Sequence, residues 1–275
     1  MNVLEPITIA FLGDFNGAPG RNVVSQRLPD LVEEHAPQAL IANGENIRSG
    51  SGITPDLYRW MRKQGIDAVT LGDHVYRDQR ILPQLEDPAE PIARPANLSP
   101  AAAGKRMIRV ELPGGLELWV ITVLGRIFFN LPANDPFMAV DELLAEIPGR
   151  NPLVLVEAHM EATSEKIALA HHLDGRVAAV VGTHTHVPTA DARVLAGGTA
   201  FITDVGMCGP YNSVIGRNKD AVLQHMRTGM HAPFNMGSGG EALCGCVIKI
   251  RAETGLAISI ERVQYDADRA RAPFK

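Results

Sequence analysis

Five short apolar runs that each end in metal-binding side chains constrain the fold of this sequence more than any other feature. The runs cover residues 7–12, 39–42, 68–71, 153–156 and 177–181. Apolar runs of this length between turn signals are typical of buried strands. Helical patterns separate them, over residues 23–34, 54–65, 139–147 and 164–173. Strands that alternate with helices favour an α/β fold with a largely parallel sheet.

The polar groups after these runs are carboxylates, an amide and imidazoles. They are Asp14, Glu45 with Asn46, Asp73 with His74, His159, and His184 with His186. Because the carboxyl ends of neighbouring parallel strands share one edge of a sheet, we expect these side chains to converge there. The alternative for His184 and His186 alone is a pair of polar turn histidines.

The remaining patterns complete a single predicted domain over residues 1–275. A turn is predicted at 17–20, and the β-like segments are 107–112, 116–124, 200–203, 247–251 and 256–262. Pro113-Gly114-Gly115 predicts a hairpin between the first two of these segments. We find no repeat and no linker, so the sequence predicts one α/β domain with mixed sheets.

Composition and charge exclude several classes of protein. A hydrophobic fraction of 45% and a charged fraction of 21% are typical of a soluble globular chain. The net charge of −5 gives no broad basic field, so strong nucleic-acid binding is not expected. The three cysteines form no disulfide framework, and we expect small buried thiols. No signal-like or membrane-spanning segment is evident, so we expect a cytoplasmic protein without a membrane partner.

The number and type of candidate ligands favour two metal ions over one. Seven donors are too many for a four-ligand zinc site. Their mixture of carboxylate, amide and imidazole suits Mn²⁺ or iron best, with Zn²⁺ as a further option. A carboxylate shared by ions about 3.5–4 Å apart would complete a two-metal site for attack at phosphorus.

In combination, these residues resemble the ordered motifs of the calcineurin-like metallophosphoesterases. More narrowly, they resemble the YmdB-like branch, bacterial phosphodiesterases of 2′,3′-cyclic nucleotides. Further strings that carry the resemblance are residues 42–46, 52–54, 94–97, 161–166 and 203–207. The resemblance extends from about residue 7 to the final strand. It implies two mixed β-sheets packed face to face as a sandwich with helices outside, a four-layer αββα fold.

The resemblance also implies a role for each candidate residue. One metal would be held by Asp14, Asn46 and His186, the other by Asp73, His159 and His184, with Glu45 bridging them. A metal-bridging hydroxide would attack phosphorus, and His74 would act as the general acid. The implied substrate is a small phosphodiester. A homo-oligomer is compatible with the sequence.

Asp73 departs from the family pattern, which reads Gly-Asn-His where this chain reads Gly72-Asp73-His74. An ionised carboxylate only accepts hydrogen bonds, whereas an amide also donates. With Asp14, Glu45, Asp73 and a bridging hydroxide, four negative charges would face two divalent ions, so the net charge of the site would be zero. With the family's asparagine at position 73, the net charge would be +1. We therefore expect a less acidic metal-bound water and weaker binding of anions. The alternative function is a metal-binding regulatory protein with weak or lost catalysis.

Some residues outside this set also have candidate roles. Glu157 lies on the same side of its strand as His159, where it would orient that ligand or have a capping or surface role. Arg21 is a candidate for phosphate binding, Asn97 is a candidate for the pocket wall, and segment 206–213 is a candidate active-site loop. An amidohydrolase barrel is disfavoured because the His-x-His pair comes late in the chain. A dinucleotide-binding fold is disfavoured because no Gly-x-Gly-x-x-Gly motif occurs.

Overall fold

A computed structural model describes residues 5–268 and contains two mixed sheets. In the first sheet the strand order is β2 (Asp14–Phe15), β11 (Met207–Pro210), β12 (Glu241–Arg251), β1 (Ile7–Leu12), β3 (Ala39–Asn43) and β4 (Ala68–Thr70), and β13 (Leu256–Asp266) also pairs with β12. In the second sheet the order is β5 (Ile108–Leu112), β6 (Leu116–Leu124), β7 (Leu153–His159), β8 (Ala179–Thr183), β10 (Ala200–Ile202) and β9 (Arg193–Val194).

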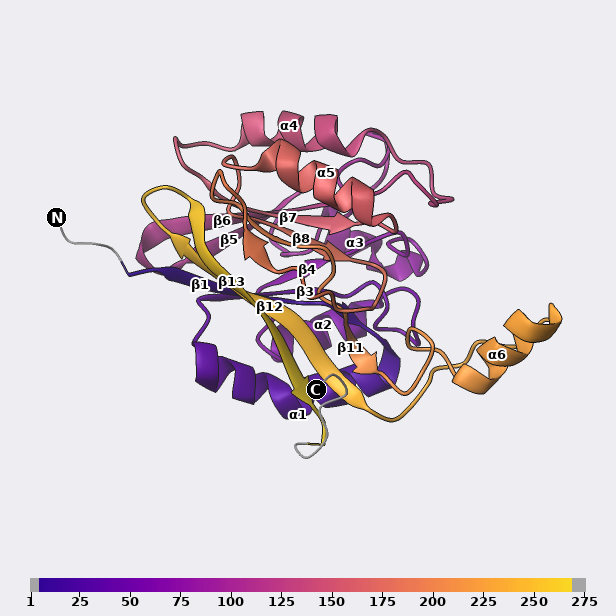
Figure 1. Ribbon diagram of the computed structural model, residues 1–275. Helices are drawn as coiled ribbons and strands as arrows, with labels where there is room; N and C mark the ends of the chain where they lie inside the picture. Colours follow the sequence, from indigo (N-terminus) through magenta and orange to yellow (C-terminus); the bar gives the residue numbers. More distant parts are fainter. Residues whose placement is uncertain (1–4, 269–275) are drawn as a thin grey trace.

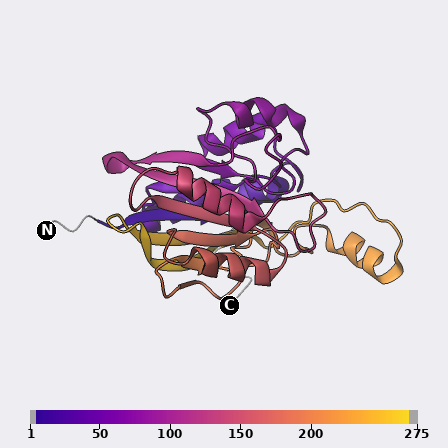
Figure 2. The same ribbon diagram turned by 90° about the horizontal axis from the view of Figure 1, so that it is seen from above.

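Helices cover the outer faces of the two sheets (Figures 1 and 2). On the first sheet these helices are α1 (Gly17–His35) and α2 (Pro55–Lys63); on the second they are α4 (Pro136–Glu146) and α5 (Thr163–Leu173). The short helix α3 (Leu82–Glu86) lies at the side of the layers. Helix α6 (Lys219–Thr228) projects away from these layers (Figure 1). Within residues 5–268, no helix has both the length and the apolar character needed to cross a bilayer. The layers match the αββα sandwich expected from the sequence.

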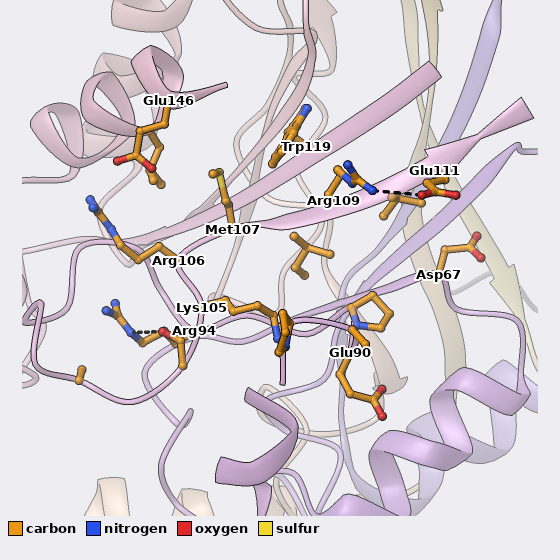
Figure 3. Close-up of a pocket in the computed structure, with 18 of the residues that line it drawn as sticks. Asp67, Glu90, Arg94, Lys105, Arg106, Met107, Arg109, Glu111, Trp119 and Glu146 are labelled. Atoms are coloured by element: carbon orange, nitrogen blue, oxygen red, sulfur yellow. Dashed lines mark hydrogen bonds and ion pairs between the residues drawn. The ribbon is translucent and has the colours of Figure 1, made fainter. Parts of the chain in front are cut away.

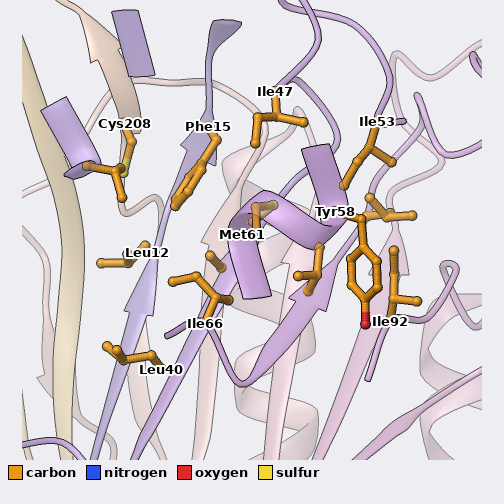
Figure 4. Close-up of a cluster of buried hydrophobic side chains, with 14 of the residues drawn as sticks. Leu12, Phe15, Leu40, Ile47, Ile53, Tyr58, Met61, Ile66, Ile92 and Cys208 are labelled. Carbon is orange, nitrogen blue, oxygen red and sulfur yellow. The ribbon is translucent and has the colours of Figure 1, made fainter. Parts of the chain in front are cut away.

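Three apolar cores hold the layers together. Ile9, Phe11 and Ile41 of the first sheet share a buried cluster with Val120 and Leu155 of the second. A second cluster joins the first sheet to its helices (Figure 4), and a third joins the second sheet to α4 and α5. Burying side chains of this size contributes about 1.5–3 kcal/mol each. The sheets are therefore fixed against one another.

The helices begin where the sequence provides suitable caps. Thr54 accepts a hydrogen bond from the backbone N–H of Leu57 at 3.3 Å and precedes Pro55, as expected. Helix α1, in contrast, begins at Gly17 instead of residue 23, so the predicted turn at 17–20 is wrong. Gly17 has φ +62° and Gly20 packs against the Cys208 carbonyl, so both glycines serve close packing inside the helix start.

The five strands that precede the polar clusters are divided between the two sheets. Strands β1, β3 and β4 are parallel neighbours in the first sheet, whereas β7 and β8 are parallel neighbours in the second. The simple expectation of one shared sheet edge is therefore wrong. The packing of the two sheets instead brings two carboxyl edges together.

Candidate metal centre

The loops after these strands bring all seven candidate ligands into one region. Asp14 begins β2 directly after β1, Asn46 follows β3, and Asp73 follows β4. His159 is the last residue of β7, and the two histidines of the 184–186 turn follow β8. The remaining candidate is Glu45, beside Asn46.

Four of the candidates form the more compact part of the cluster. Donor atoms of Glu45, Asp73, His159 and His184 all lie within 4.8 Å of one another. The Nε2 atom of His159 lies 3.3 Å from Glu45 Oε1 and 3.2 Å from Asp73 Oδ1. The same nitrogen lies 3.2 Å from Nδ1 of His184. This group has the imidazole and carboxylate donors that a transition metal prefers.

The other three candidates form a second group that also contacts Glu45. The amide nitrogen of Asn46 lies 3.3 Å from Asp14 Oδ1, 3.2 Å from His186 Nε2 and 3.1 Å from Glu45 Oε1. Glu45 therefore contacts both groups of donors. The amide oxygen of Asn46, which is the atom a metal would bind, here lies 2.8 Å from Nδ1 of His74. Asn46 would have to turn its amide over to become a ligand.

Each of the three candidate histidines points one ring nitrogen into the cluster and has the other nitrogen engaged outside it. The outer contacts are His159 Nδ1 to Thr183 Oγ1 at 2.9 Å, His184 Nε2 to Glu161 Oε2 at 3.3 Å, and His186 Nδ1 to the Ile215 carbonyl at 3.0 Å. Such outer partners fix the tautomer and the ring orientation of metal-binding histidines. The donor set therefore fits one or two transition-metal ions.

Gly72 permits the close approach of the two sheets at the cluster. A Cβ atom at this position would lie 2.1 Å from His159 Nε2 and 2.3 Å from Glu45 Oε2. The next residue but one, His74, donates its backbone N–H to the same Glu45 oxygen at 3.0 Å. Any side chain at position 72 would displace two candidate ligands.

A buried chain of hydrogen bonds holds His159 from behind. Glu157 is fully buried and accepts hydrogen bonds from Asn43, Thr122 and Thr183 at 2.7–2.8 Å. Because the Thr183 hydroxyl donates to Glu157, its oxygen accepts from the Nδ1–H of His159. When His159 is neutral, as a metal ligand must be, Nε2 then presents its lone pair to the cluster. Glu157 therefore orients a candidate ligand through Thr183, one of the two roles considered from sequence.

The turn that carries His184 and His186 is strained. Both residues have positive φ values, +92° and +65°, which are uncommon for a side chain other than glycine. Between them, Thr185 donates to Asp204 Oδ2 from its backbone N–H at 3.1 Å and from its hydroxyl at 2.8 Å. Asp204 therefore holds the centre of the turn.

Lys166 of α5 completes this support. Its ammonium group lies 2.8 Å from Asp204 Oδ2 and 2.7 Å from the Thr183 carbonyl, and the Lys166 and Asp204 side chains are almost completely buried. Sequence reasoning missed this role, although both residues lie in strings that carried the family resemblance. The signal available was a lysine and an aspartate in apolar surroundings, because buried charges require partners.

The opposed charges in the cluster shift the pKa values of its members. Burial by itself raises the pKa of Asp73, but hydrogen bonds from His159 and His184 outweigh it and hold the pKa well below its ordinary value. Burial lowers the pKa of His159, but the charge of Glu45 and a hydrogen bond to Asp73 raise it well above its ordinary value. Without metal, protonated imidazole thus balances the carboxylates.

Three other sequence candidates have structural contacts instead of the suggested roles. Asn97 binds the backbone of Leu124 and Asn134 and does not line the pocket beside the cluster. Arg21 donates to the Ile47 carbonyl at 2.7 Å. Much of the predicted loop 206–213 is the buried strand β11.

Two cavities lie near these elements. One, of about 450 Å³, is lined by Asp73 and His184 and adjoins the cluster. The other, of about 1000 Å³, lies beside β5 and contains none of the seven candidate ligands (Figure 3). Its basic residues are already engaged; Arg94 donates to the Pro95 carbonyl at 2.8 Å and Arg109 pairs with Glu111 at 3.1 Å. The smaller cavity is therefore the one placed to serve the candidate site.

Comparisons with known proteins agree with the fold and show the family. A 2′,3′-cyclic-nucleotide 2′-phosphodiesterase of Bacillus subtilis (strain 168) is 42% identical over 260 residues, which cover 94% of this chain and 97% of that protein. A crystal structure from Thermus thermophilus, described as a hypothetical protein, has a TM-score of 0.87 and 42% identity over 94% of this chain and 99% of its own. A crystal structure described as a novel phosphatase of Mycoplasma pneumoniae has a TM-score of 0.88 and 30% identity over 96% and 95% of the two chains. The model of the YmdB-like protein family matches residues 10–263, so the chain belongs to this family.

Proposed function

We propose that this protein is a metal-dependent phosphodiesterase that opens 2′,3′-cyclic nucleotides. The observation that carries the proposal is the cluster at the two sheet edges, where three histidines with fixed outer nitrogens face carboxylates from three loops. The enzyme class, a phosphoric diester hydrolase, follows from the family. The cyclic nucleotide is the substrate named for the Bacillus subtilis relative.

The proposed ligands form two sets that share one residue. Asp14, Asn46 and His186 would hold one ion, Asp73, His159 and His184 the other, and Glu45 would contact both. When bound, two such ions lower the pKa of water and neutralise charge on the phosphoryl oxygens. Manganese or iron suits these donors best.

His74 is the proposed general acid. Its Nδ1 atom lies 2.8 Å from the Asn46 amide oxygen, and its Nε2 atom lies 3.6 Å from Asp73 Oδ2. The side chain is partly exposed, so it is accessible to a substrate. Its Nε2–H is the group that would donate a proton to the departing ribose oxygen. Opening a cyclic phosphate breaks one P–O bond and needs one such protonation.

Steady-state hydrolysis of 2′,3′-cyclic AMP by the Mn²⁺-loaded protein tests this function. His74→Gln is expected to lower kcat by about 100-fold or more without loss of metal, because general acid catalysis typically contributes that much. His172→Ala is a matched control, because His172 pairs with Asp141 on an exposed part of the molecule. A loaded wild-type protein that leaves cyclic nucleotides intact would contradict the proposal and favour the regulatory metal-binding alternative suggested by Asp73.

A further inference from the structure

The 450 Å³ cavity extends from the metal cluster toward an aromatic loop. Asp73 and His184 form its inner wall, and Tyr76, Arg77, Phe128 and Phe129 belong to the rest of its lining. A molecule whose phosphate lies at the cluster would therefore extend into this cavity. Its volume is within the range of small-molecule sites, about 300–1,000 Å³.

The loop that carries the aromatic residues is held at both ends. Asn97 accepts a hydrogen bond from the backbone N–H of Leu124 at 2.8 Å and donates to the Leu124 and Asn134 carbonyls at 2.9 Å. From α5, Glu165 accepts hydrogen bonds from the backbone N–H groups of Arg126 and Ile127 at 2.9 and 3.2 Å. Both ends of the loop are therefore held in place beside the cavity.

Phe129 connects this loop to the proposed ligands. Its ring centroid lies 4.7 Å from that of His184 and 6.3 Å from that of His159. The aromatic wall thus begins in contact with the metal cluster. Any planar group in the cavity would lie directly beside the proposed reaction centre.

Phe128, the neighbouring residue, is exposed and strained. Its side chain is 81% exposed, and its φ of +64° is an outlier for a bulky residue. Such strain persists only where the surroundings enforce it, and it concentrates at functional sites. Here the strain is not offset by burial of the ring. The loop therefore presents a large apolar face to solvent at the cavity.

Arg77 supplies positive charge to the same cavity. It is exposed, and its guanidinium makes no hydrogen bond or ion pair with any residue between 5 and 268. An aromatic face together with an unpaired guanidinium is the combination that binds nucleobases through stacking and cation–π contacts.

We propose that this cavity binds the nucleobase of the substrate, with Phe128 as the stacking surface and Arg77 at its rim. The inference rests on the proposed phosphodiesterase function and adds a specificity-determining site to it. Stacking depends little on which base is bound, because every base has a π-face. The protein therefore accepts different bases but discriminates against cyclic phosphates that lack a base.

The test compares 2′,3′-cyclic AMP with ribose 2,3-cyclic phosphate, which has the same reacting group but no base. For the Mn²⁺-loaded wild type we expect kcat/KM to be about 10-fold or more higher for the nucleotide. Phe128→Ala lowers this preference by about 10-fold, mainly through KM, and Phe128→Trp restores it. Phe234→Ala, which removes another exposed aromatic ring, keeps the wild-type preference. Equal losses on both substrates in Phe128→Ala, or no loss, would overturn the proposal.

If the wild-type protein hydrolyses neither substrate, the proposed function is refuted, but the base site can still be tested. In that case, the binding of 3′-AMP and of ribose 3-phosphate to wild type and Phe128→Ala is measured by calorimetry. Tighter binding of the nucleotide that is lost in the variant upholds the inference. Equal binding of the two ligands to the wild type overturns it.

Discussion

The buried pair Lys166–Asp204 gives the sharpest test of how the fold positions the candidate site. Lys166→Met removes the ammonium group but keeps much of the side-chain volume. Removing one partner of a buried ion pair costs about 3–5 kcal/mol, because the other charge stays buried and uncompensated. Asp204 retains hydrogen bonds from Thr185 and Gly206. We therefore expect the lower end of this range, about 3 kcal/mol of unfolding free energy.

The same change is expected to weaken metal binding. Lys166 and Asp204 hold the turn in which His184 and His186 adopt strained conformations, each costing about 1–3 kcal/mol. Without this support the turn relaxes and its imidazoles move. Loss of a residue that supports metal ligands typically lowers metal affinity by about 10–100-fold.

Urea unfolding of EDTA-treated protein and calorimetric titration with Mn²⁺ measure the two effects separately. Lys105→Met is the control, because Lys105 donates to backbone carbonyls of Gln84 and Leu85 and lies outside the cluster. The double variant Lys166→Met/Asp204→Asn removes both charges but keeps an acceptor for Thr185 and Gly206, so it recovers part of the lost stability. A Lys166→Met variant that keeps wild-type Mn²⁺ affinity and loses less than about 1 kcal/mol of unfolding free energy would refute the reasoning.

Other expectations follow from the same cluster. Asp73→Asn raises the net charge of the loaded site, so phosphate inhibits more strongly and the acidic limb of the pH–rate profile moves to lower pH; an unchanged inhibition constant and profile would exclude this effect. The pKa values of His159 and His186 are raised, so protons compete with metal for these imidazoles up to a higher pH than usual. Mn²⁺ affinity measured by calorimetry is therefore expected to increase from about pH 6 to pH 8. An affinity that does not change with pH would show that metal binding displaces no protons from these residues. Gly72→Ala places a methyl group against His159 and Glu45, so the purified variant binds less metal by elemental analysis than wild type; full metal content in the variant would contradict this expectation.

Local patterns in the sequence were sufficient to predict most strands and the residues at their ends. An apolar run that stops at Asp14 or His159 is visible in a few consecutive residues, so the structure needed only to bring these ends together. The order of strands and their division between two sheets depend on pairings across long sequence separations, such as β1 with β12. These pairings leave no local signal. The family resemblance, not the residue pattern, predicted the two-sheet sandwich.

Positions where one residue type serves two kinds of structure were predicted less well. Glycines at 17 and 20 are typical of a turn, yet they lie in the first turn of α1, where Gly20 packs closely on Cys208 of β11 and Gly17 on Met236. Asn97 is polar and lies between prolines, which suggested a pocket residue, but it fixes the ends of the 124–134 loop. The Lys166–Asp204 pair is separated by 38 residues, so neither residue indicates the other.

Metal content is the most direct test of the central claim that the two sheet edges form one paired-metal site. Elemental analysis of wild-type protein loaded with Mn²⁺ is expected to give about two equivalents per chain. His186→Ala is expected to bind clearly less, whereas His172→Ala, remote from the cluster, retains the wild-type content. A wild-type chain that neither contains nor takes up metal, or a His186→Ala variant with full content, would contradict the account.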